Sequence, residues 1–297
     1  MRFFALTTEF GSRHQIWCVD NLEAYRVGFD DPKAQRNCYL QLKGADGLAD
    51  QFREAFPFWG EQSLEELELP PGSYYPRMAR PFAIDPNSVF AFPQEGLYRE
   101  QVASSIGQIL SLLSQISDLC RVIEPVPENL GAYGHAIREC ILIASMEVES
   151  HCKAVLRANG FEKSKLSTRD YHLVSTPMKL REYGLRFNRY PMLGSLAPFA
   201  GWEAEKPTQS LKFYNAYNLI KHDRENCFQE ATLENAFEAV AACVILVVAQ
   251  FGMVETFRMN RGLVDAVSFK NRPKWTTAQC YSSERSGAIP VQYSFEN

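Results

Sequence analysis

The segment that precedes the most apolar stretch of the chain combines an amide, an imidazole and two cations. Asn218 and His222 are four residues apart, a spacing that places both on one face of a helix. Histidine titrates near neutral pH, so His222 can take or give a proton during phosphodiester cleavage. Lys221 and Arg224 flank the helix end and would hold a phosphate and stabilise developing charge. The pattern indicates a candidate site in which His222, Asn218 and Arg224 are catalytic and Lys221 binds the ligand.

A simpler interpretation of the same helix needs no chemistry. Its opposite face is apolar, with Phe213, Ala216, Tyr217 and Ile220 spaced by three and four residues. Cations near a helix C-terminus are favourable by roughly 0.3–1 kcal/mol. The polar residues would then form a solvated face and a charge-complemented helix end. Both interpretations stay open at the level of the sequence.

The wider stretch resembles a known superfamily. Residues 214–224 read Tyr-Asn-Ala-Tyr-Asn-Leu-Ile-Lys-His-Asp-Arg, and an alanine-rich apolar segment ending Gln250-Phe251-Gly252 follows. A helix ending in Asn-x-x-x-His before an apolar helix is similar to the HEPN (higher eukaryotes and prokaryotes nucleotide-binding) superfamily. The stretch from about residue 100 to residue 255 also resembles an uncharacterised group of bacterial proteins. The resemblance implies a cytoplasmic helical bundle that binds RNA or nucleotide, often as a homodimer, in a stress or defence system; active members cleave RNA.

One position departs from the catalytic pattern of that superfamily. The pattern places an arginine directly before the asparagine, and Tyr217 stands there instead. Only Asn218 and His222 match, with Arg224 as the candidate substitute for the arginine. Three functions therefore stay open: a degenerate ribonuclease, a relative that binds RNA or nucleotide without cutting it, and a structural or protein-interaction module.

Two acidic residues border the apolar stripe of the helix expected from about residue 130 to residue 158. They are Glu147 and Glu149. Acidic groups at the margin of a core usually pair with bases. We therefore expect Glu147 or Glu149 to pair with Lys221, His222 or Arg224, either as a structural salt bridge or as a tuned acid/base site that contributes to ligand binding.

Two further groups of residues carry weaker signals. Arg77 and Arg80 lie among aromatic residues and form a basic-aromatic patch, which can stack bases and grip phosphate or can simply cover the core. The aromatic residues around them are Tyr74, Tyr75 and Phe82. His135 and Arg138 lie on the opening turns of a predicted helix, where we expect both to be exposed to solvent.

Composition and motifs exclude several other classes of function. The formal net charge is −4, so a strongly basic nucleic-acid coat is excluded, although a small local basic patch is not. The eight cysteines form no CxxC pair, and buried thiols in a reducing cytoplasm are the expected state. There is no Gly-rich phosphate loop, HExxH or GxSxG motif. We therefore predict no cofactor and no metal.

The elements that would position the candidate site are helical. From Leu97 onward, apolar residues recur at steps of three and four, which predicts amphipathic helices. The four main helices are expected at about 97–124, 130–158, 208–222 and 232–251. The last contains the unbroken apolar run Ala239–Ala249, which is shorter than the about 20 residues that a membrane span needs. We therefore predict that it is the central buried helix and that the protein has no membrane partner.

The N-terminal third follows a different pattern. Residues 1–95 contain short aromatic and β-branched runs separated by turn residues, which predicts strands, and the proline-rich part 57–95 is expected to be extended and irregular. Residues 261–297 are expected to form a C-terminal extension with strands at 264–269 and 289–295 that return to the N-terminal strands. The predicted fold class is α+β, mainly α: an antiparallel, HEPN-like helical bundle at 96–260 with a small β-rich N-terminal region.

Overall fold

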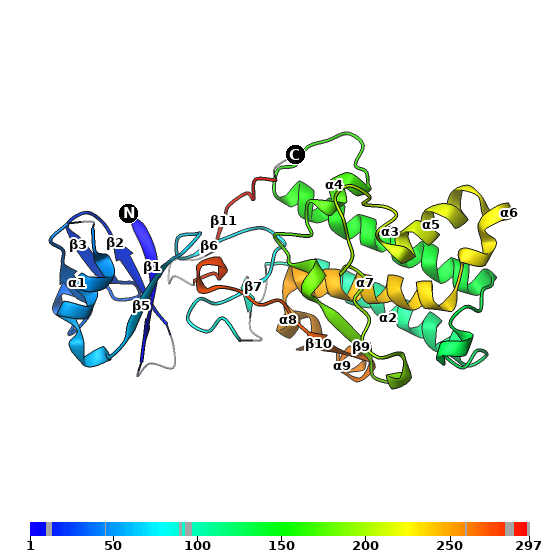
Figure 1. Cartoon of the computed structure of the whole chain (residues 1–297), viewed down its shortest axis with the longest axis horizontal. Helices are drawn as coiled ribbons and strands as arrows, with labels where there is room; N and C mark the ends of the chain where they lie inside the picture. The colour runs from blue at the N-terminus through cyan, green and yellow to red at the C-terminus, as the bar shows by residue number, and fades with distance from the viewer. Residues whose placement is uncertain are drawn as a thin grey trace. The chain divides into compact units, whose positions relative to one another are not determined.

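The computed structural model describes residues 1–9, 14–44, 46–88, 91–92, 97–258, 260–282 and 288–295. The protein has an α+β fold whose residues divide into two compact units (Figure 1). The first, which we name the sheet unit, comprises Met1–Tyr75, Arg80–Pro93 and Trp275–Val291. The second, the helical unit, comprises Pro76–Ala79, Gln94–Lys274 and Gln292–Asn297. Each unit is therefore assembled from segments that are distant in the sequence.

The sheet unit is built on an antiparallel sheet. Its strands are β1 (Arg2–Thr8), β2 (Gln15–Val19), β3 (Glu23–Arg26), β4 (Tyr39–Gln41) and β5 (Gln62–Glu66). They are arranged in the order β4-β3-β2-β1-β5, so β1 lies between β2 and β5. The strands predicted in the first 42 residues are confirmed. The expectation of irregular structure after residue 57 is wrong for β5, because its ladder with β1 forms a strand from a segment with only one apolar residue.

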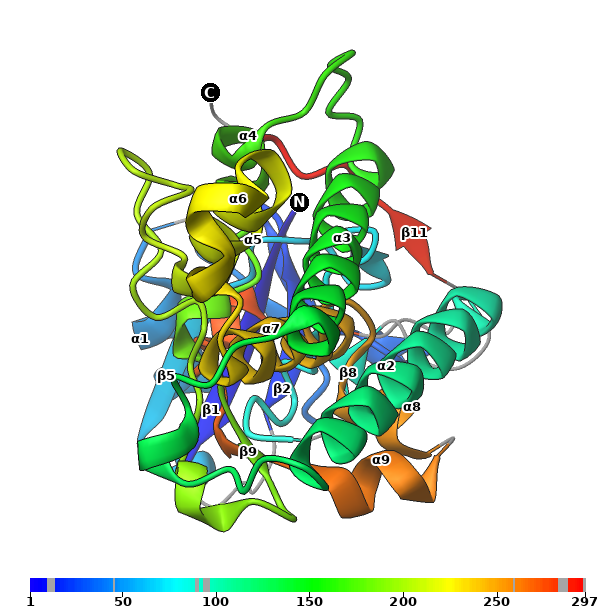
Figure 2. The same cartoon turned by 90° about the vertical axis from the view of Figure 1, so that its right-hand side faces the viewer.

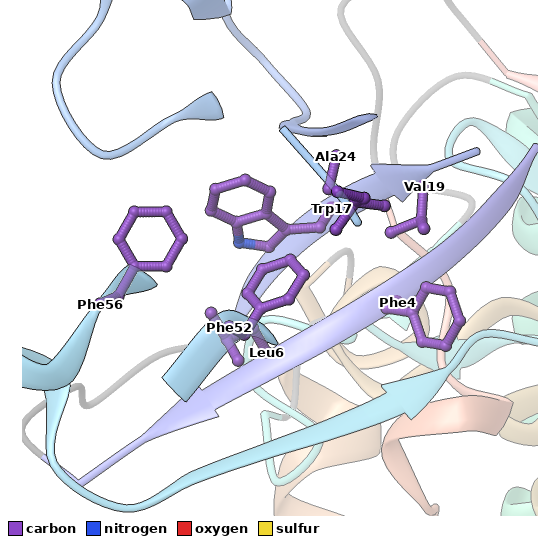
Figure 3. Packing of buried hydrophobic residues seen from close by; sticks show 8 residues of the cluster. Phe4, Leu6, Trp17, Val19, Ala24, Phe52 and Phe56 are labelled. Atoms are coloured by element: carbon purple, nitrogen blue, oxygen red, sulfur yellow. The ribbon is translucent and has the colours of Figure 1, made fainter. Parts of the chain in front are cut away.

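The core of the sheet unit follows from the alternation of side chains along these strands. Phe4 and Leu6 of β1 and Trp17 and Val19 of β2 point to the same face of the sheet (Figure 3). Helix α1 (Leu48–Ala55) covers this face with Phe52, whose ring centroid lies 4.9 Å from that of Trp17 in an edge-to-face arrangement. A second cluster lies on the opposite side. It consists of Ala5, Ile16, Leu67, Ala83 and Cys280.

Short strand pairs complete the sheet unit. They are formed by β6 (Ser73–Tyr74), β7 (Arg80–Pro81), β8 (Ala91–Phe92) and β11 (Ile289–Pro290). β11 pairs in parallel with β6, and β7 pairs in antiparallel fashion with β8. The end of the chain thus does return to the N-terminal region, as the sequence predicts, but it pairs with β6 and not with the five-stranded sheet.

The helical unit is organised around one buried helix. Its helices are α2 (Arg99–Cys120), α3 (His135–Ala158), α4 (Thr168–His172), α5 (Lys212–His222), α6 (Arg224–Cys227), α7 (Leu233–Phe251), α8 (Met253–Arg258) and α9 (Arg261–Ala266). Helices α2, α3 and α5 all pack against α7. Every residue of α7 is buried except Glu234 and Glu238. The prediction of a central buried helix is therefore confirmed.

The ends of α7 explain its length. The side chain of Thr232 accepts a hydrogen bond from the backbone N–H of Asn235 at the start of the helix. Gly252 follows the last residue with a φ of 84°, a conformation that L side chains rarely adopt. Within the described part of the chain, α7 is the one helix long and apolar enough to cross a membrane, and 89% of that apolar window is buried inside the protein.

Two strands of the helical unit correct the sequence prediction. β9 (Gly184–Phe187) and β10 (Val267–Asn271) form an antiparallel pair, with Phe187 opposite Val267. The strand predicted at 264–269 therefore pairs with β9 and does not return to the N-terminal strands. β9 itself was not predicted, because its four residues are too few to show a period.

Candidate functional site at the end of helix α5

The predicted site residues lie at the end of α5. His222 is the last residue of this helix, and the side chains of Lys221 and His222 are exposed. Arg224 begins α6 and is also exposed. Asp223, between the two helices, accepts a hydrogen bond from the backbone N–H of Asn226 and so caps α6. The structure thus places three basic side chains around one helix junction, which lies on the right of Figure 1 and faces the viewer in Figure 2.

A fourth cation joins this junction from α3. The guanidinium group of Arg138 donates to the backbone carbonyl oxygen of Ile220, from Nε at 3.4 Å and from Nη2 at 3.3 Å. A carbonyl in the last turn of a helix lacks a partner within the helix, so Arg138 satisfies it. Arg138 is therefore half-buried, contrary to the expectation of solvent exposure, whereas His135 is exposed as predicted. We name Arg138, Lys221, His222 and Arg224 the cation site.

Asn218 does not orient the imidazole. Its Nδ2 donates to the backbone carbonyl oxygen of Tyr214 at 3.1 Å, and no hydrogen bond between Asn218 and His222 is present among the described residues. Tyr217, at the position of the superfamily's arginine, is only 1% exposed. Its hydroxyl accepts a hydrogen bond from Lys221 Nζ at 2.8 Å, and that ammonium lies 4.8 Å from the centroid of the Tyr217 ring. Tyr217 thus belongs to the core and positions Lys221.

Glu149 pairs with residues other than the predicted ones. Its Oε2 lies 2.9 Å from Lys153 Nζ, one helical turn further along α3, and its Oε1 accepts a hydrogen bond from the Tyr214 hydroxyl at 2.8 Å. No ion pair joins Glu147 or Glu149 to Lys221, His222 or Arg224 in the described part of the chain. The predicted ion pair is therefore absent from the described residues, although the charge of Lys221 acts on Glu149 and helps to lower the pKa of its carboxyl group. Glu149 does link α3 to α5, through Tyr214.

The electrostatics of the two glutamates differ. Burial opposes the ionisation of Glu149, but hydrogen bonds from Lys153 and Tyr214 outweigh it and hold the pKa of this carboxyl below its ordinary value. Burial alone raises the pKa of Glu147. Glu149 is therefore a structural carboxylate held by Lys153 and Tyr214, whereas the side chain of Glu147 forms no hydrogen bond or ion pair with the described residues.

The arrangement can hold an anion, and it lacks an assembled proton-transfer pair. Among the described residues, no carboxylate forms an ion pair with any member of the cation site. No hydrogen bond orients the imidazole of His222 within that same set of residues. The described residues also contain no group of three His, Cys, Asp or Glu side chains that could hold a metal ion. Four basic groups, none of which forms an ion pair within the described residues, are suited to the phosphate of a ligand.

The basic-aromatic patch predicted around Arg77 and Arg80 is not a surface for nucleic acid. The side chain of Arg80 is 4% exposed, forms an ion pair with Glu68 at 3.0 Å and lies within the sheet unit. Arg77 belongs to the helical unit, where its Nε donates to Oε1 of the fully buried Gln250 at 2.8 Å. The two arginines therefore stabilise separate cores, which corresponds to the alternative that the sequence left open.

One titratable residue on α7 escaped the sequence prediction. Glu238 stands just before the apolar run, and burial, reinforced by the charge of Glu234, raises its pKa to about 7. Lys212 acts in the opposite direction but forms its ion pair with Glu234, at 2.6 Å. Glu238 could have been identified from the sequence, because it is a carboxyl residue within an otherwise apolar helix. Glu238 lies on α7 and is not a member of the cation site.

Replacing Glu238 with glutamine is expected to stabilise the protein above about pH 4.5, with the full gain reached above about pH 7. The folded-state pKa lies above the ordinary value of 4.5, so the wild-type protein loses stability as the pH rises from about 4.5 through about 7. Urea unfolding should show the variant more stable than the wild type by about 2 kcal/mol at pH 8 and equal to it at pH 4.5. Glu234→Gln, which removes only the reinforcing charge and leaves Glu238 buried, should show a smaller gain. A pH-independent difference for Glu238→Gln would contradict this assignment.

A group of aromatic side chains beside the cation site also escaped the sequence prediction. The ring of Phe228, which follows α6, lies 4.7 Å from that of His135 and 5.8 Å from that of Tyr133. Tyr133 and Phe228 are far apart in the sequence, so no local pattern reveals their contact. We name Tyr133, His135 and Phe228 the aromatic group.

Comparisons with known proteins add no relative. Neither the protein-family models, nor the curated proteins, nor the solved structures include a match to this chain.

Proposed function

We propose that this protein binds RNA or a nucleotide by its phosphate at the cation site and does not cleave it. The observation that carries the proposal is the gathering of Arg138, Lys221, His222 and Arg224 at one helix junction, with no carboxylate paired to any of them among the described residues. The chain as a whole has a net charge of −4, so the positive charge of the cation site differs in sign from the charge of the whole chain. The resemblance of the helix end from Asn218 to His222 to the HEPN superfamily supports the choice of ligand.

Three features favour binding over cleavage. Tyr217 occupies the position of the superfamily's arginine and is buried. The amide of Asn218 is engaged by its own helix. General acid–base catalysis needs a donor and an acceptor positioned around the scissile group, and His222 has no oriented partner within the described residues. We therefore propose that this protein is a relative of the superfamily that binds RNA or a nucleotide without cleaving it. The resemblance implies that it acts in a stress or defence system.

Removing two exposed cations is expected to weaken RNA binding about tenfold. Lys221→Gln/Arg224→Gln removes two phosphate contacts, so the slope of log affinity against log salt should also fall by about 1.4 for a single strand. Fluorescence anisotropy with a labelled single-stranded RNA, from 50 mM salt upward, measures both quantities. The matched control is Arg157→Gln/Lys165→Gln, which removes two exposed cations elsewhere in the helical unit and should change affinity less than twofold.

Two results would contradict the proposal. Absence of binding by the wild-type protein at low salt would favour a structural or protein-interaction module. Cleavage of total RNA by the purified protein, lost in His222→Ala, would instead identify a ribonuclease. We expect intact RNA in that assay and measurable binding in the anisotropy assay.

A further inference from the structure

The aromatic group provides an exposed surface beside the cation site. Tyr133 is 57% exposed, His135 is exposed and Phe228 is partly buried beneath them. The Phe228 ring meets Tyr133 edge to face, at an interplanar angle of 88°, and meets His135 in a tilted arrangement at 41°. Phe228 thus supports the other two rings, and Tyr133 and His135 keep surface that solvent reaches.

The backbone fixes the aromatic group next to the cations. His135 is the first residue of α3, one turn before Arg138, so both lie on the same side of that helix. Tyr133 forms a β-bridge with Thr232, at the start of α7. Phe228 begins a short 3-10 turn that packs against α5. Figure 2 looks onto this end of the helical unit, where α6 and the end of α5 lie. The rings and the cations therefore belong to one surface of the same unit.

We propose that Tyr133, His135 and Phe228 form a subsite for an unstacked nucleobase whose phosphate occupies the cation site. This inference rests on the proposed function and deepens it by naming the form of the ligand. Aromatic rings bind bases through their faces with little dependence on sequence, provided that the base is free of its neighbours. A duplex keeps its bases stacked, so it offers nothing to this subsite. The ligand is a nucleotide or a single-stranded segment.

The acidic residues near the site agree with a small footprint. Glu139 on α3, Glu225 on α6 and Glu230 next to Phe228 are neighbours of the cations in the sequence, and Glu139 and Glu225 are exposed. They repel additional phosphates, so the surface accommodates one or two phosphates and not the long run that a duplex presents. Replacing Glu225 with glutamine should therefore strengthen the binding of a short strand.

A pair of probes tests the subsite on the unaltered protein. One probe is a labelled adenosine pentanucleotide, and the other is its abasic counterpart with the same length and charge. We expect the base-bearing probe to bind about tenfold more tightly. Equal affinity for the two probes would overturn the subsite and leave the proposed function standing. Absence of binding to both would overturn the proposed function and the subsite together.

Variants assign the preference to the aromatic group. Tyr133→Ser/His135→Ala should reduce the tenfold preference to nearly one and leave the salt slope unchanged, whereas Lys221→Gln/Arg224→Gln should lower the slope and keep the preference. Phe58→Ser removes an aromatic side chain of similar exposure, 54%, from the sheet unit and serves as the control. Thermal melting verifies that each variant is folded. If the folded variant Tyr133→Ser/His135→Ala still preferred the base-bearing probe, the assignment of the subsite to the aromatic group would be overturned. If that variant does not fold, the comparison of the two probes on the wild-type protein decides whether the subsite exists.

Discussion

Replacing Trp17 with alanine is expected to lower the free energy of unfolding of the sheet unit by about 3–5 kcal/mol. The indole is fully buried and contacts Phe52 and Phe56 of the cluster drawn in Figure 3. Its removal leaves a cavity between the sheet and α1 that the surrounding strands fill only in part. Hydrogen exchange should show faster exchange of the amides of β1 and β2, because local unfolding of this unit becomes easier.

The matched variant for this prediction is Trp17→Phe. The indole Nε1 is buried without a hydrogen-bond partner in the described structure, so phenylalanine removes an unsatisfied donor while keeping most of the ring contacts. We expect it to cost much less than alanine does. Equal losses for the two variants would mean that the ring contacts with Phe52 and Phe56 contribute little to the stability of the sheet unit.

Replacing Glu149 with leucine is expected to destabilise the helical unit by about 3 kcal/mol at neutral pH. The change leaves the half-buried ammonium of Lys153 and the hydroxyl of the buried Tyr214 without their shared acceptor. Urea unfolding, followed by circular dichroism at the helical wavelength of 222 nm, measures the loss.

Glu147→Gln is the control for that variant. Burial raises the pKa of Glu147, so removing its charge should be neutral or slightly stabilising. The pKa of Glu149 is lowered, so the stability that its charge provides is present above the ordinary value of 4.5 and disappears as the pH falls through the folded-state pKa. The difference between wild type and Glu149→Leu should therefore shrink in acid. A loss of equal size in Glu147→Gln would contradict the distinction between the two glutamates.

The sequence predicts the long elements because their patterns are local. The apolar run of α7, the stripes of α2 and α3 and the aromatic and β-branched runs of β1 and β2 are each long enough to identify the element. Elements with few residues escape this reasoning. β5 and β9 are strands because β1 and β10 provide their hydrogen-bond partners, and no pattern within them indicates this.

For the candidate site, too, the sequence predicts what is local and misses the contacts between distant residues. Lys221, His222 and Arg224 are close in sequence, so helical spacing places them correctly at one helix end. Arg138 reaches the same end from 82 residues away, and Phe228 meets Tyr133 across a comparable gap. The partners of Glu149 show the same contrast: Lys153 lies four residues further along the same helix, within reach of local spacing, whereas only packing selects Tyr214.

Each unit is assembled from segments that are distant in the sequence, and this affects when the units can fold during synthesis. Asn159, at the end of α3, donates to the carbonyl oxygen of Pro76 and accepts from the backbone N–H of Tyr293, and the N–H of Ala79 donates to the carbonyl oxygen of Ala249. The helical unit thus needs Pro76–Ala79 and Gln292–Asn297 on either side of its main segment, and the sheet unit needs Trp275–Val291. During synthesis on the ribosome, neither unit is complete until its last segment, Trp275–Val291 or Gln292–Asn297, has emerged. The nascent N-terminal strands must therefore wait, with part of their apolar surface uncovered, for Trp275–Val291, which are translated much later than the strands.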